Sequence, residues 1–581
     1  MIKLIKLFSD PEIFNPIIFK SGLNLILGEK SESSNKTNGV GKSISIEFLN
    51  YCLLKKASDS RVLNIPTELI DPSTNIKLEL YIHSHHLTII RNIGDPDKVA
   101  ILINDLEKTF DSLEDASEYL GNLYFEGFLD YKVKISLRNL LAPIIRDEKS
   151  EFKDIIKCYD TDKNIPRDYK PHLFFLGLNL DLYSEIRKII DSLEKKTKYA
   201  SETKKLLTNN QQIKISEAKA RLNELDHEVA SINNSIEKLR NKDSYDLIQT
   251  EIIALETKVS ELRTIQKATQ FEIKQIESLP IPEDISEQEI KILFNNFKEG
   301  LGDIVSKSIE EVKVFKNKID GFRNYLVGER LAILKEGLFT LNSELRVLDE
   351  SYTEKLSLIE KGELLKDLKT SLNIFNNKNE ELNNLKALIN RFDIAENEKE
   401  ELKILKNNKL HEFRDKILEK QEVIKSFEQT ILLVHERIMD NRKAHFEIQT
   451  VNKANVKDFL YFDLRTDDDG SHSTDRVKVL IYDIALLFNE QTSKRHPKFL
   501  VHDNIFDIDQ DSLEKSLIFL HNQEKNNLND FQYILTLNRD ILEAIEQTNK
   551  LGFNIENYKR ASYTKENRFL KKKYTEVKRR K

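Results

Sequence analysis

The sequence has few of the residues that interrupt helices or cross-link a fold. Its 581 residues include only 16 glycines and 11 prolines, so long uninterrupted elements are expected. The two cysteines, Cys52 and Cys158, form no CxxC pair, which argues against a disulfide framework or a zinc hook and favours a reducing, cytoplasmic compartment. No run of 18 apolar residues occurs and the N-terminus has no signal-peptide core, so no membrane segment is expected.

The composition is rich in charge and poor in core residues. Charged residues make up 32% of the chain and hydrophobic residues 39%, which is typical of long solvated helices. The formal net charge of -6 argues against a protein that coats nucleic acid by bulk charge. Any contact with nucleic acid must therefore come from a local patch.

The middle of the chain carries a coiled-coil pattern. Steps of three and four residues separate the apolar positions Leu222, Leu225, Val229, Ile232, Ile236 and Leu239. The same spacing recurs from Leu331 to Leu348 and from Leu382 to Phe392. This pattern predicts an antiparallel helical hairpin, with amphipathic helices of an ordinary bundle as the alternative.

Short apolar runs at both ends predict strands. A meander is expected near Leu78, Leu87 and Val99, and later runs at 459–464, 498–503 and 531–538 alternate with helical stretches as in a parallel sheet. Pro280, Pro282, Gly300 and Gly302 mark the place where the coil turns back. The expected divisions are an N-terminal lobe (1–180), an outward arm (181–277), an apex (278–330), a returning arm (331–450), a C-terminal lobe (451–558) and a basic tail (559–581).

A phosphate-binding loop is predicted near the N-terminus. The apolar strand Asn24–Gly28 precedes Asn38, Gly39, Val40, Gly41, Lys42 and Ser43, and an apolar helix follows. In such loops backbone N–H groups surround phosphate oxygens, the lysine neutralises the β- and γ-phosphates and the hydroxyl binds Mg²⁺. The first glycine of the usual pattern is absent, because Lys36 stands there and Gly28 opens a longer loop.

The complementary metal-binding strand is predicted about 460 residues later. It runs from Lys498 to Asp503, and an acid at the end of such a strand holds Mg²⁺ directly or through water. An apolar strand that ends in a capping aspartate is the alternative. Because the coil lies between the two segments, both ends of the chain are expected to form one nucleotide-binding head.

These segments and their layout resemble the SMC-like branch of the ABC ATPases. The resemblance implies an α/β ABC-type head assembled from N- and C-terminal lobes, with a long antiparallel coiled-coil hairpin inserted between them. It implies ATP and Mg²⁺ as cofactors and a homodimer in which two heads sandwich ATP. The signature segment expected to face the partner's nucleotide is 469–476, with Ser471 or Ser473 toward the γ-phosphate, although the family's double glycine is missing. A helix N-cap is the alternative.

Three positions depart from the family pattern. Asn504 follows Asp503 where the family has a catalytic glutamate, and asparagine can orient water without taking its proton. Asn538 replaces the switch histidine. No glutamine precedes Gln211, so 146–148 is a candidate substitute for the metal-binding glutamine, with ordinary surface charge as the alternative. Asp507 is a candidate alternative base or dimer contact.

The substitutions around 502–507 and 537–540 resemble the bacterial YydD-like group of SMC-type ATPases, which carries a C-terminal domain of unknown function. That group is associated with ABC three-component defence systems, and Lamassu-type ATPases are a neighbouring possibility. The resemblance implies an antiviral ATPase that clamps or senses double-stranded DNA, with a nuclease-like effector and small accessory subunits as partners. A non-hydrolysing ATP-dependent scaffold and a housekeeping recombination-repair ATPase are the alternatives, and a tethering coil with a vestigial head is a third.

The last 23 residues hold eleven lysines or arginines against two glutamates. A basic stretch of this kind contacts phosphate backbones or acts as a solubilising tail. The candidate DNA-binding residues are Lys571, Lys572, Lys573, Arg579 and Arg580.

Overall fold

The computed structural model describes residues 1–31, 37–104, 106–126, 128, 135–161, 163, 165–209, 212–240, 248–277, 309–357, 363–452, 458–466, 472–506, 510–526, 530–547 and 550–577. The chain divides into two compact units. The first, which we call the head, comprises 1–185, 285–313 and 409–581. The second, which we call the arms, comprises 186–284 and 314–408.

A five-stranded parallel sheet lies at the centre of the head, in the order β13-β3-β12-β11-β8. Strands β3 (Gly22–Gly28) and β8 (Ile145–Arg146) come from the N-terminal part of the chain. Strands β11 (Phe499–Asp503), β12 (Gln532–Asn538) and β13 (Lys559–Tyr563) come from the C-terminal part. Because β3 pairs with both β12 and β13, the two ends of the chain interleave in one sheet, which confirms the predicted fold class.

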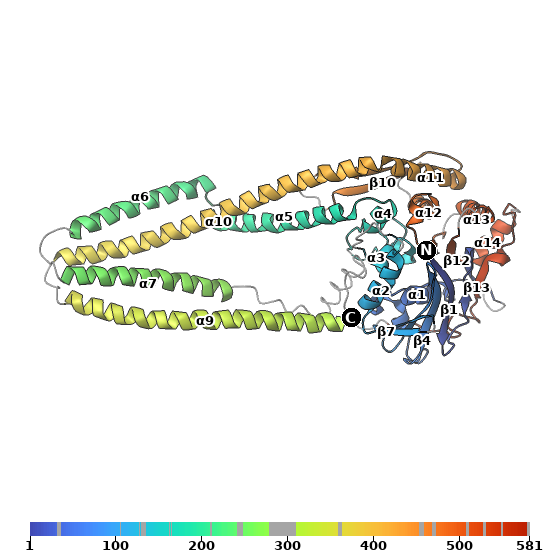
Figure 1. The fold of residues 1–581 in the computed structure, drawn as a ribbon, viewed down its shortest axis with the longest axis horizontal. Helices are drawn as coiled ribbons and strands as arrows, with labels where there is room; N and C mark the ends of the chain where they lie inside the picture. Colours follow the sequence, from blue (N-terminus) through green and yellow to red (C-terminus); the bar gives the residue numbers. More distant parts are fainter. Residues whose placement is uncertain are drawn as a thin grey trace. The chain divides into compact units, whose positions relative to one another are not determined.

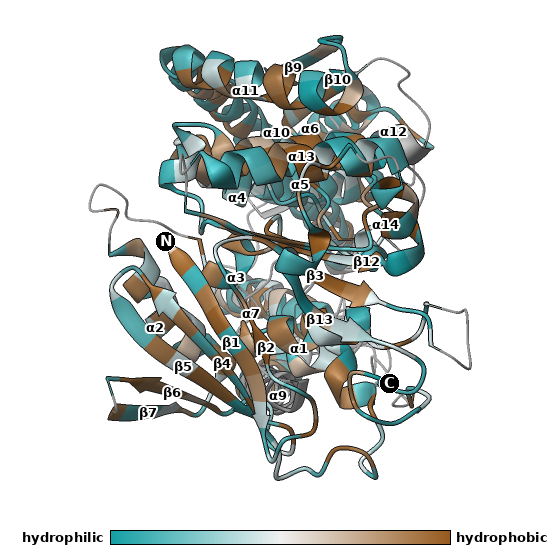
Figure 2. Cartoon of the chain, turned by 90° about the vertical axis from the view of Figure 1, so that its right-hand side faces the viewer, coloured by the Kyte–Doolittle hydropathy of each residue, from teal (hydrophilic) through white to brown (hydrophobic). Residues whose placement is uncertain are grey.

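Helices cover both faces of this sheet. Every residue of β3, β11 and β12 is buried, as expected of parallel strands that are covered on both sides. Helix α1 (Lys42–Cys52) packs against strands of the parallel sheet and also against a second, antiparallel sheet (Figure 2). On the other face, α12 (His472–Phe488) contacts β11, and α13 (Gln510–Lys525) contacts β3.

The antiparallel sheet has six strands in the order β2-β1-β4-β5-β6-β7. Alternate residues of its strand β4 are buried, the pattern of a strand with one face on the core. The predicted meander is confirmed, since the apolar runs at Leu78, Leu87 and Val99 lie in β4, β5 and β6. The strand bounds are β1 Ile2–Asp10, β2 Ile17–Ile18, β4 Asn75–Ile82, β5 His85–Asn92, β6 Val99–Ile103 and β7 Leu106–Phe110.

Shorter elements complete the head. The strand predicted at 459–464 does not join the parallel sheet, because β10 (Leu460–Thr466) pairs antiparallel with β9 (Ala444–Thr450). Its alternating burial fits a half-covered hairpin rather than a strand buried on both faces. The head also contains the α-helices α2 Leu113–Phe125, α3 Leu137–Leu140, α4 Lys170–Phe175, α11 Gln421–Met439 and α14 Arg539–Glu546.

The arms consist of long helices. Their bounds are α5 Leu180–Leu207, α6 Ile215–Arg240, α7 Ile248–Glu277, α9 Ile309–Ser357 and α10 Glu363–Glu419. The division from the head falls within α5, α9 and α10. A narrow apolar cluster joins α5, α6 and α10, with Leu207, Ala218, Ile389 and Phe392 buried in it.

Cross-helix contacts give the helix directions (Figure 1). Helix α6 is antiparallel to α10, because Lys219 pairs with Asp393 while Arg221, further along α6, pairs with Glu381. Helix α7 runs parallel to α10, as Ser260 bonds Asn376 and Lys267 pairs with Glu380.

The chain therefore reverses between α6 and α7, within the stretch 181–277 that the sequence predicts as one outward arm. Helix α7 is in turn antiparallel to α9, since Arg263 pairs with Asp349 and Glu272 pairs with Arg330. The segment 241–247 contains neither proline nor glycine, and a heptad seam looks the same for either helix direction. The expected apex, 278–330, lies for the most part outside the described residues.

Candidate functional site

The phosphate-loop motif lies where β3 leads into α1. Gly41 caps α1 with a backbone φ of 113°, a conformation that glycine adopts without strain. No side chain caps this helix, and its first turn holds no acidic residue. The N–H groups and the positive end of the helix dipole are therefore available to an anion.

The Lys42 ammonium lies over the end of the sheet. Its Nζ donates to the Asn538 side-chain oxygen at 2.5 Å and to the Thr37 carbonyl at 3.3 Å. The sheet register pairs Asn538 with Gly28, so the lysine passes directly over that glycine. A Cβ at Gly28 would come within 2.7 Å of the Lys42 Nζ, which explains why the strand ends in glycine.

Asn538 thus links the phosphate loop to β12. Its amide nitrogen also donates to the Asn38 side-chain oxygen at 3.0 Å. The side chain predicted at the switch position therefore holds two loop residues, and a neutral amide does this without changing charge.

Ser43 and Asp503 come together although they are distant in the sequence. The Ser43 hydroxyl donates to the Asp503 carboxylate at 3.1 Å, and the Thr536 hydroxyl donates to the same oxygen at 2.6 Å. Thr536 also accepts from the backbone N–H of Asn504 at 2.9 Å. A serine hydroxyl beside an aspartate is the oxygen pair that holds Mg²⁺ next to phosphates in nucleotide sites.

The Asp503 carboxyl is buried, and its ionisation is suppressed. Burial raises its pKa to about 7, and the neighbouring Glu148 carboxylate contributes in the same direction. Hydrogen bonds from Thr536 and Ser43 act in the opposite direction. A divalent cation would remove much of the free-energy cost of ionising the buried Asp503 carboxyl, because it supplies positive charge where water cannot reach.

The donor set fits magnesium better than a metal held by protein alone. Among the described residues, no group of three or more His, Cys, Asp or Glu side chains is placed to hold a metal ion. Mg²⁺ keeps several waters and binds through one or two protein oxygens together with phosphates. Ser43 and Asp503 meet that requirement.

Asn504 faces an acid. Its side-chain nitrogen donates to the Glu148 carboxylate at 3.0 Å, and its backbone φ of 62° lies in the left-handed region that asparagine tolerates. Glu148 belongs to the stretch 146–148 that the sequence offers as a substitute metal ligand. Of the three residues in that stretch, Glu148 is the one that lines the cavity described next.

A cavity of about 650 Å³ opens over these groups. The phosphate loop from Asn38 to Ser43 lines this cavity, and so do Glu148 and Asn504. Residues of the C-terminal segment and Arg61 form the remaining wall. Its size is in the range of cavities that enclose small ligands.

A buried charge cluster lies behind the metal strand. Asp483 of α12 forms an ion pair with Arg146 at 2.6 Å and contacts the His502 Nε2 at 3.0 Å. Burial holds the pKa of His502 below its ordinary value, so its ring is neutral and Nε2–H donates to Asp483. The other ring nitrogen accepts from the Tyr533 hydroxyl at 2.9 Å. The helix after the signature-like segment is thereby tied to the residue just before Asp503.

The remaining predicted residues lie in three settings. Ser471, Asp507, Arg579 and Arg580 fall outside the described residues, and Ser473 lies in the first turn of α12. Lys571 is exposed and pairs with Glu12 at 2.9 Å, and Lys573 is exposed. Lys572 is also exposed, and it lines the cavity.

The stretch 559–581 is not only a tail. Lys559–Tyr563 forms β13 at the edge of the parallel sheet, and Phe569 is buried against Phe14 and Phe48. The sequence gives no local sign of this packing, because Phe569 and Leu570 stand among lysines and arginines. Thr536, by contrast, leaves a weak signal as a polar residue inside an apolar strand.

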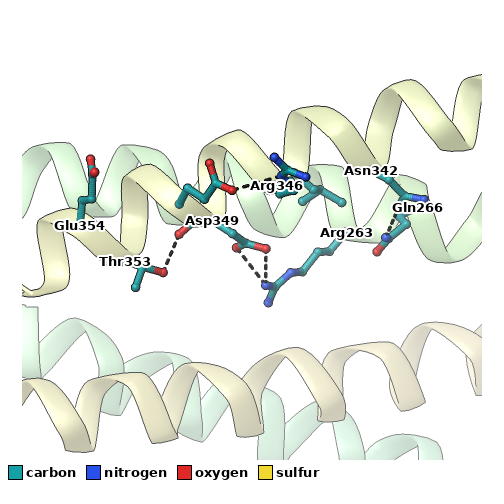
Figure 3. Close-up of a pocket in the computed structure, with 9 residues that line it drawn as sticks. Arg263, Gln266, Asn342, Arg346, Asp349, Thr353 and Glu354 are labelled. Carbon is teal, nitrogen blue, oxygen red and sulfur yellow. Dashed lines mark hydrogen bonds and ion pairs between the residues drawn. The ribbon is translucent and has the colours of Figure 1, made fainter.

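A larger cavity, about 930 Å³, lies along α7 and α9 in the arms (Figure 3). Its charged side chains pair with one another, as Arg263 does with Asp349 at 3.0 Å and Arg346 with Glu350 at 3.1 Å. It contains no loop motif and none of the buried carboxylates. The chemistry-bearing residues are at the head cavity, which we take as the functional site.

Comparisons with known proteins show three similarities. The sequence profile of a family described as an uncharacterised protein conserved in bacteria (DUF2326) matches residues 434–573. Uncharacterized protein YydD of Bacillus subtilis (strain 168) is 24% identical over 610 aligned residues, covering 98% of this chain and 99% of that protein. A crystal structure of the Smc head domain with a coiled coil and joint, derived from Pyrococcus yayanosii, aligns over 94% of each chain with 14% identity and a TM-score of 0.32.

No helix among the described residues combines the length and the apolar character needed to cross a bilayer.

Proposed function

We propose that this protein is an SMC-like ATPase whose head binds ATP with Mg²⁺. One observation carries the proposal: the Ser43 hydroxyl and the Asp503 carboxylate, 460 residues apart, meet at 3.1 Å beside the Lys42 loop. Lys42 would neutralise the β- and γ-phosphates, and Ser43 with Asp503 would hold the metal. The phosphate loop and the metal strand are both needed for MgATP, and the cavity has room for a nucleotide.

Hydrolysis is proposed to be slow. Asn504 stands where the family has its base, and its amide, fixed by Glu148, orients water without accepting a proton. Glu148, whose carboxylate accepts the hydrogen bond from Asn504, serves as the base or as a water-mediated metal ligand. Asp507 remains the alternative base and Asn538 the proposed sensor of the γ-phosphate.

The test is nucleotide binding and phosphate release by the full chain. Isothermal titration with MgATP is expected to show binding that Lys42→Ala abolishes, and steady-state phosphate release is expected to fall to background in Asp503→Asn. Equal phosphate release by wild type and Lys42→Ala, with binding retained in the wild type, favours the scaffold. No binding at all favours the vestigial head.

We further propose that ATP bridges two heads, with Ser471 or Ser473 of one subunit facing the nucleotide of the other. Light scattering with a non-hydrolysable analogue tests this, and a monomer at saturating nucleotide contradicts it. Clamping of double-stranded DNA, a nuclease-like effector and accessory subunits, and a cytoplasmic defence role follow from the resemblance alone. A small partner gene beside a nuclease-like gene would favour defence over housekeeping repair.

A further inference from the structure

Residues of the C-terminal segment 564–577 line the cavity, and the segment is attached to the rest of the head at both ends. At the first end it bonds the phosphate loop itself. The Phe569 N–H donates to the Val40 carbonyl at 3.2 Å, and the Arg568 guanidinium donates to the Gly39 carbonyl at 2.6 Å. The Lys565 ammonium contacts the Asn38 carbonyl.

Packing fixes this first attachment. The Phe569 ring stacks on Phe14 at 4.5 Å and meets Phe48 of α1 edge-on at 5.2 Å. A Cβ at Gly41 would lie 2.5 Å from the Phe569 Cβ. The second glycine of the loop is therefore needed for this segment as well as for its own backbone conformation.

The second attachment joins the end of the segment to residues 61–64. The Arg61 guanidinium donates two hydrogen bonds to one oxygen of Glu576, at 2.6 and 3.0 Å. The Val577 N–H donates to the Asn64 carbonyl at 2.8 Å. Residues 570–575 are thus held between two fixed points, and Leu570, Lys572, Tyr574 and Thr575 line the cavity.

The charges of the lining favour a polyanion. Four cationic side chains line the cavity, namely Lys42, Arg61, Arg568 and Lys572, against the two carboxylates Glu148 and Glu576. Glu576 is already paired with Arg61. Among the described residues, Lys572 has no hydrogen bond or ion pair, although its neighbour Lys571 has one with Glu12.

The geometry points to a binding role for this segment: it forms the second wall of the nucleotide pocket, and Lys572, supported by Arg568, contacts the phosphates of the bound nucleotide from the side opposite Lys42. This inference rests on the proposed ATP-binding function and assigns part of the basic stretch to nucleotide rather than to DNA. A cation in the lining of this cavity would strengthen nucleotide binding by a charge-assisted hydrogen bond to the phosphates.

The test compares two neighbouring lysines in the full chain. Lys572→Gln is expected to weaken MgATP binding roughly tenfold in isothermal titration at low salt, because it removes one cation at the phosphates. Lys573→Gln, which makes the same charge change next to it outside the cavity lining, is the matched control and is expected to change affinity less than about twofold. Hydrogen exchange provides a second measurement, with slower exchange of 570–575 expected on adding ATP.

The outcomes separate this inference from the proposed function. If the wild type fails to bind ATP, or Lys42→Ala binds equally well, the proposed function fails. If binding depends on Lys42 but the two lysine variants have equal affinity and exchange at 570–575 is unchanged, only this inference fails. Equal weakening of duplex DNA binding by both variants, with ATP affinity unchanged, would also overturn it and return the segment to a DNA contact.

Discussion

The head and the arms use the same charged residue types in opposite ways. In the head, Asp483 and Arg146 are buried and form an ion pair, and the neutral His502 ring is buried beside them. In the arms, cross-helix pairs such as Lys219–Asp393 have both side chains nearly half exposed. A buried charge has a large cost unless its partner is present, whereas an exposed pair is screened by water and salt.

The apolar cores differ in the same way. The head buries whole strands between helices, while the arms bury single positions along a seam, such as Leu225 and Ile236 of α6. Substitutions in the head are therefore expected to affect both stability and chemistry. Substitutions in the arms are expected to affect local helix packing and to leave the site intact.

The largest expected effect is at the buried cluster. Asp483→Ala leaves Arg146 buried without its carboxylate and removes the contact to His502, so a loss of about 3–5 kcal/mol in the free energy of unfolding is expected. Denaturant unfolding of the full chain, followed by circular dichroism, measures this loss. Asp393→Ala in the arms is the comparison, and a similar loss for both variants would contradict the distinction between the two regions.

A stabilising change is expected at Asp503. Its folded-state pKa, about 7, lies above the ordinary value of 3.8, so the folded state binds the proton more tightly than the unfolded state. The unfolding free energy of the nucleotide-free protein should fall as pH rises from about 4 to 7 and remain low above that. Asp503→Asn removes the penalty, so it should stabilise the nucleotide-free protein at pH 8 by about 2–4 kcal/mol while abolishing ATP hydrolysis.

Thermal melts from pH 4 to pH 8 measure this effect. The melting temperatures of wild type and Asp503→Asn should be similar near pH 4 and diverge toward pH 8. In a Glu148→Gln background the difference in melting temperature that Asp503→Asn makes at pH 8 should be smaller, because the Glu148 carboxylate helps to raise the pKa of Asp503. Parallel curves for wild type and Asp503→Asn over the whole range would refute the assignment of a buried, suppressed carboxyl.

An intermediate effect is expected in the seam of the arms. Ile389→Ala opens a gap in the cluster with Leu207, Ala218 and Phe392, and a loss of about 2 kcal/mol is expected because a narrow seam relaxes more readily than a sheet core. Ile534→Ala in β12 is the matched change in the head and should cost more. The MgATP affinity should change only in the head variant.

The smallest effect is expected at the exposed ion pairs of the arms. Arg221→Ala removes the contacts with Glu224 and Glu381, both exposed, and should lower stability by less than about 0.5 kcal/mol. Addition of salt should abolish even this difference. A loss above 1 kcal/mol that persists at high salt would mean that the arms depend on specific pairing as the head does.

Much of the candidate site can be predicted from the sequence because its parts are local motifs. The loop around Lys42 and the strand ending in Asp503 each have a recognisable pattern, and the coil between them predicts that they meet, as Ser43 and Asp503 do. Thr536 and Glu148 are harder to find, since a polar residue in a strand and an acid in a loop are common. Their roles depend on the sheet register, which pairs Thr536 with Asp503.

The long helices, the meander, the strands at 498–503 and 531–538 and the candidate phosphate and metal ligands follow from the sequence alone, because spacing and residue type act over a few neighbouring positions. Only the tertiary structure decided that α7 reverses against α6, that Asn504 faces Glu148 and that Lys572 reaches the cavity. The physical reason is that each of these depends on contacts between distant segments. A seam, an amide or a lysine has many acceptable partners, and the packing of the whole chain selects one.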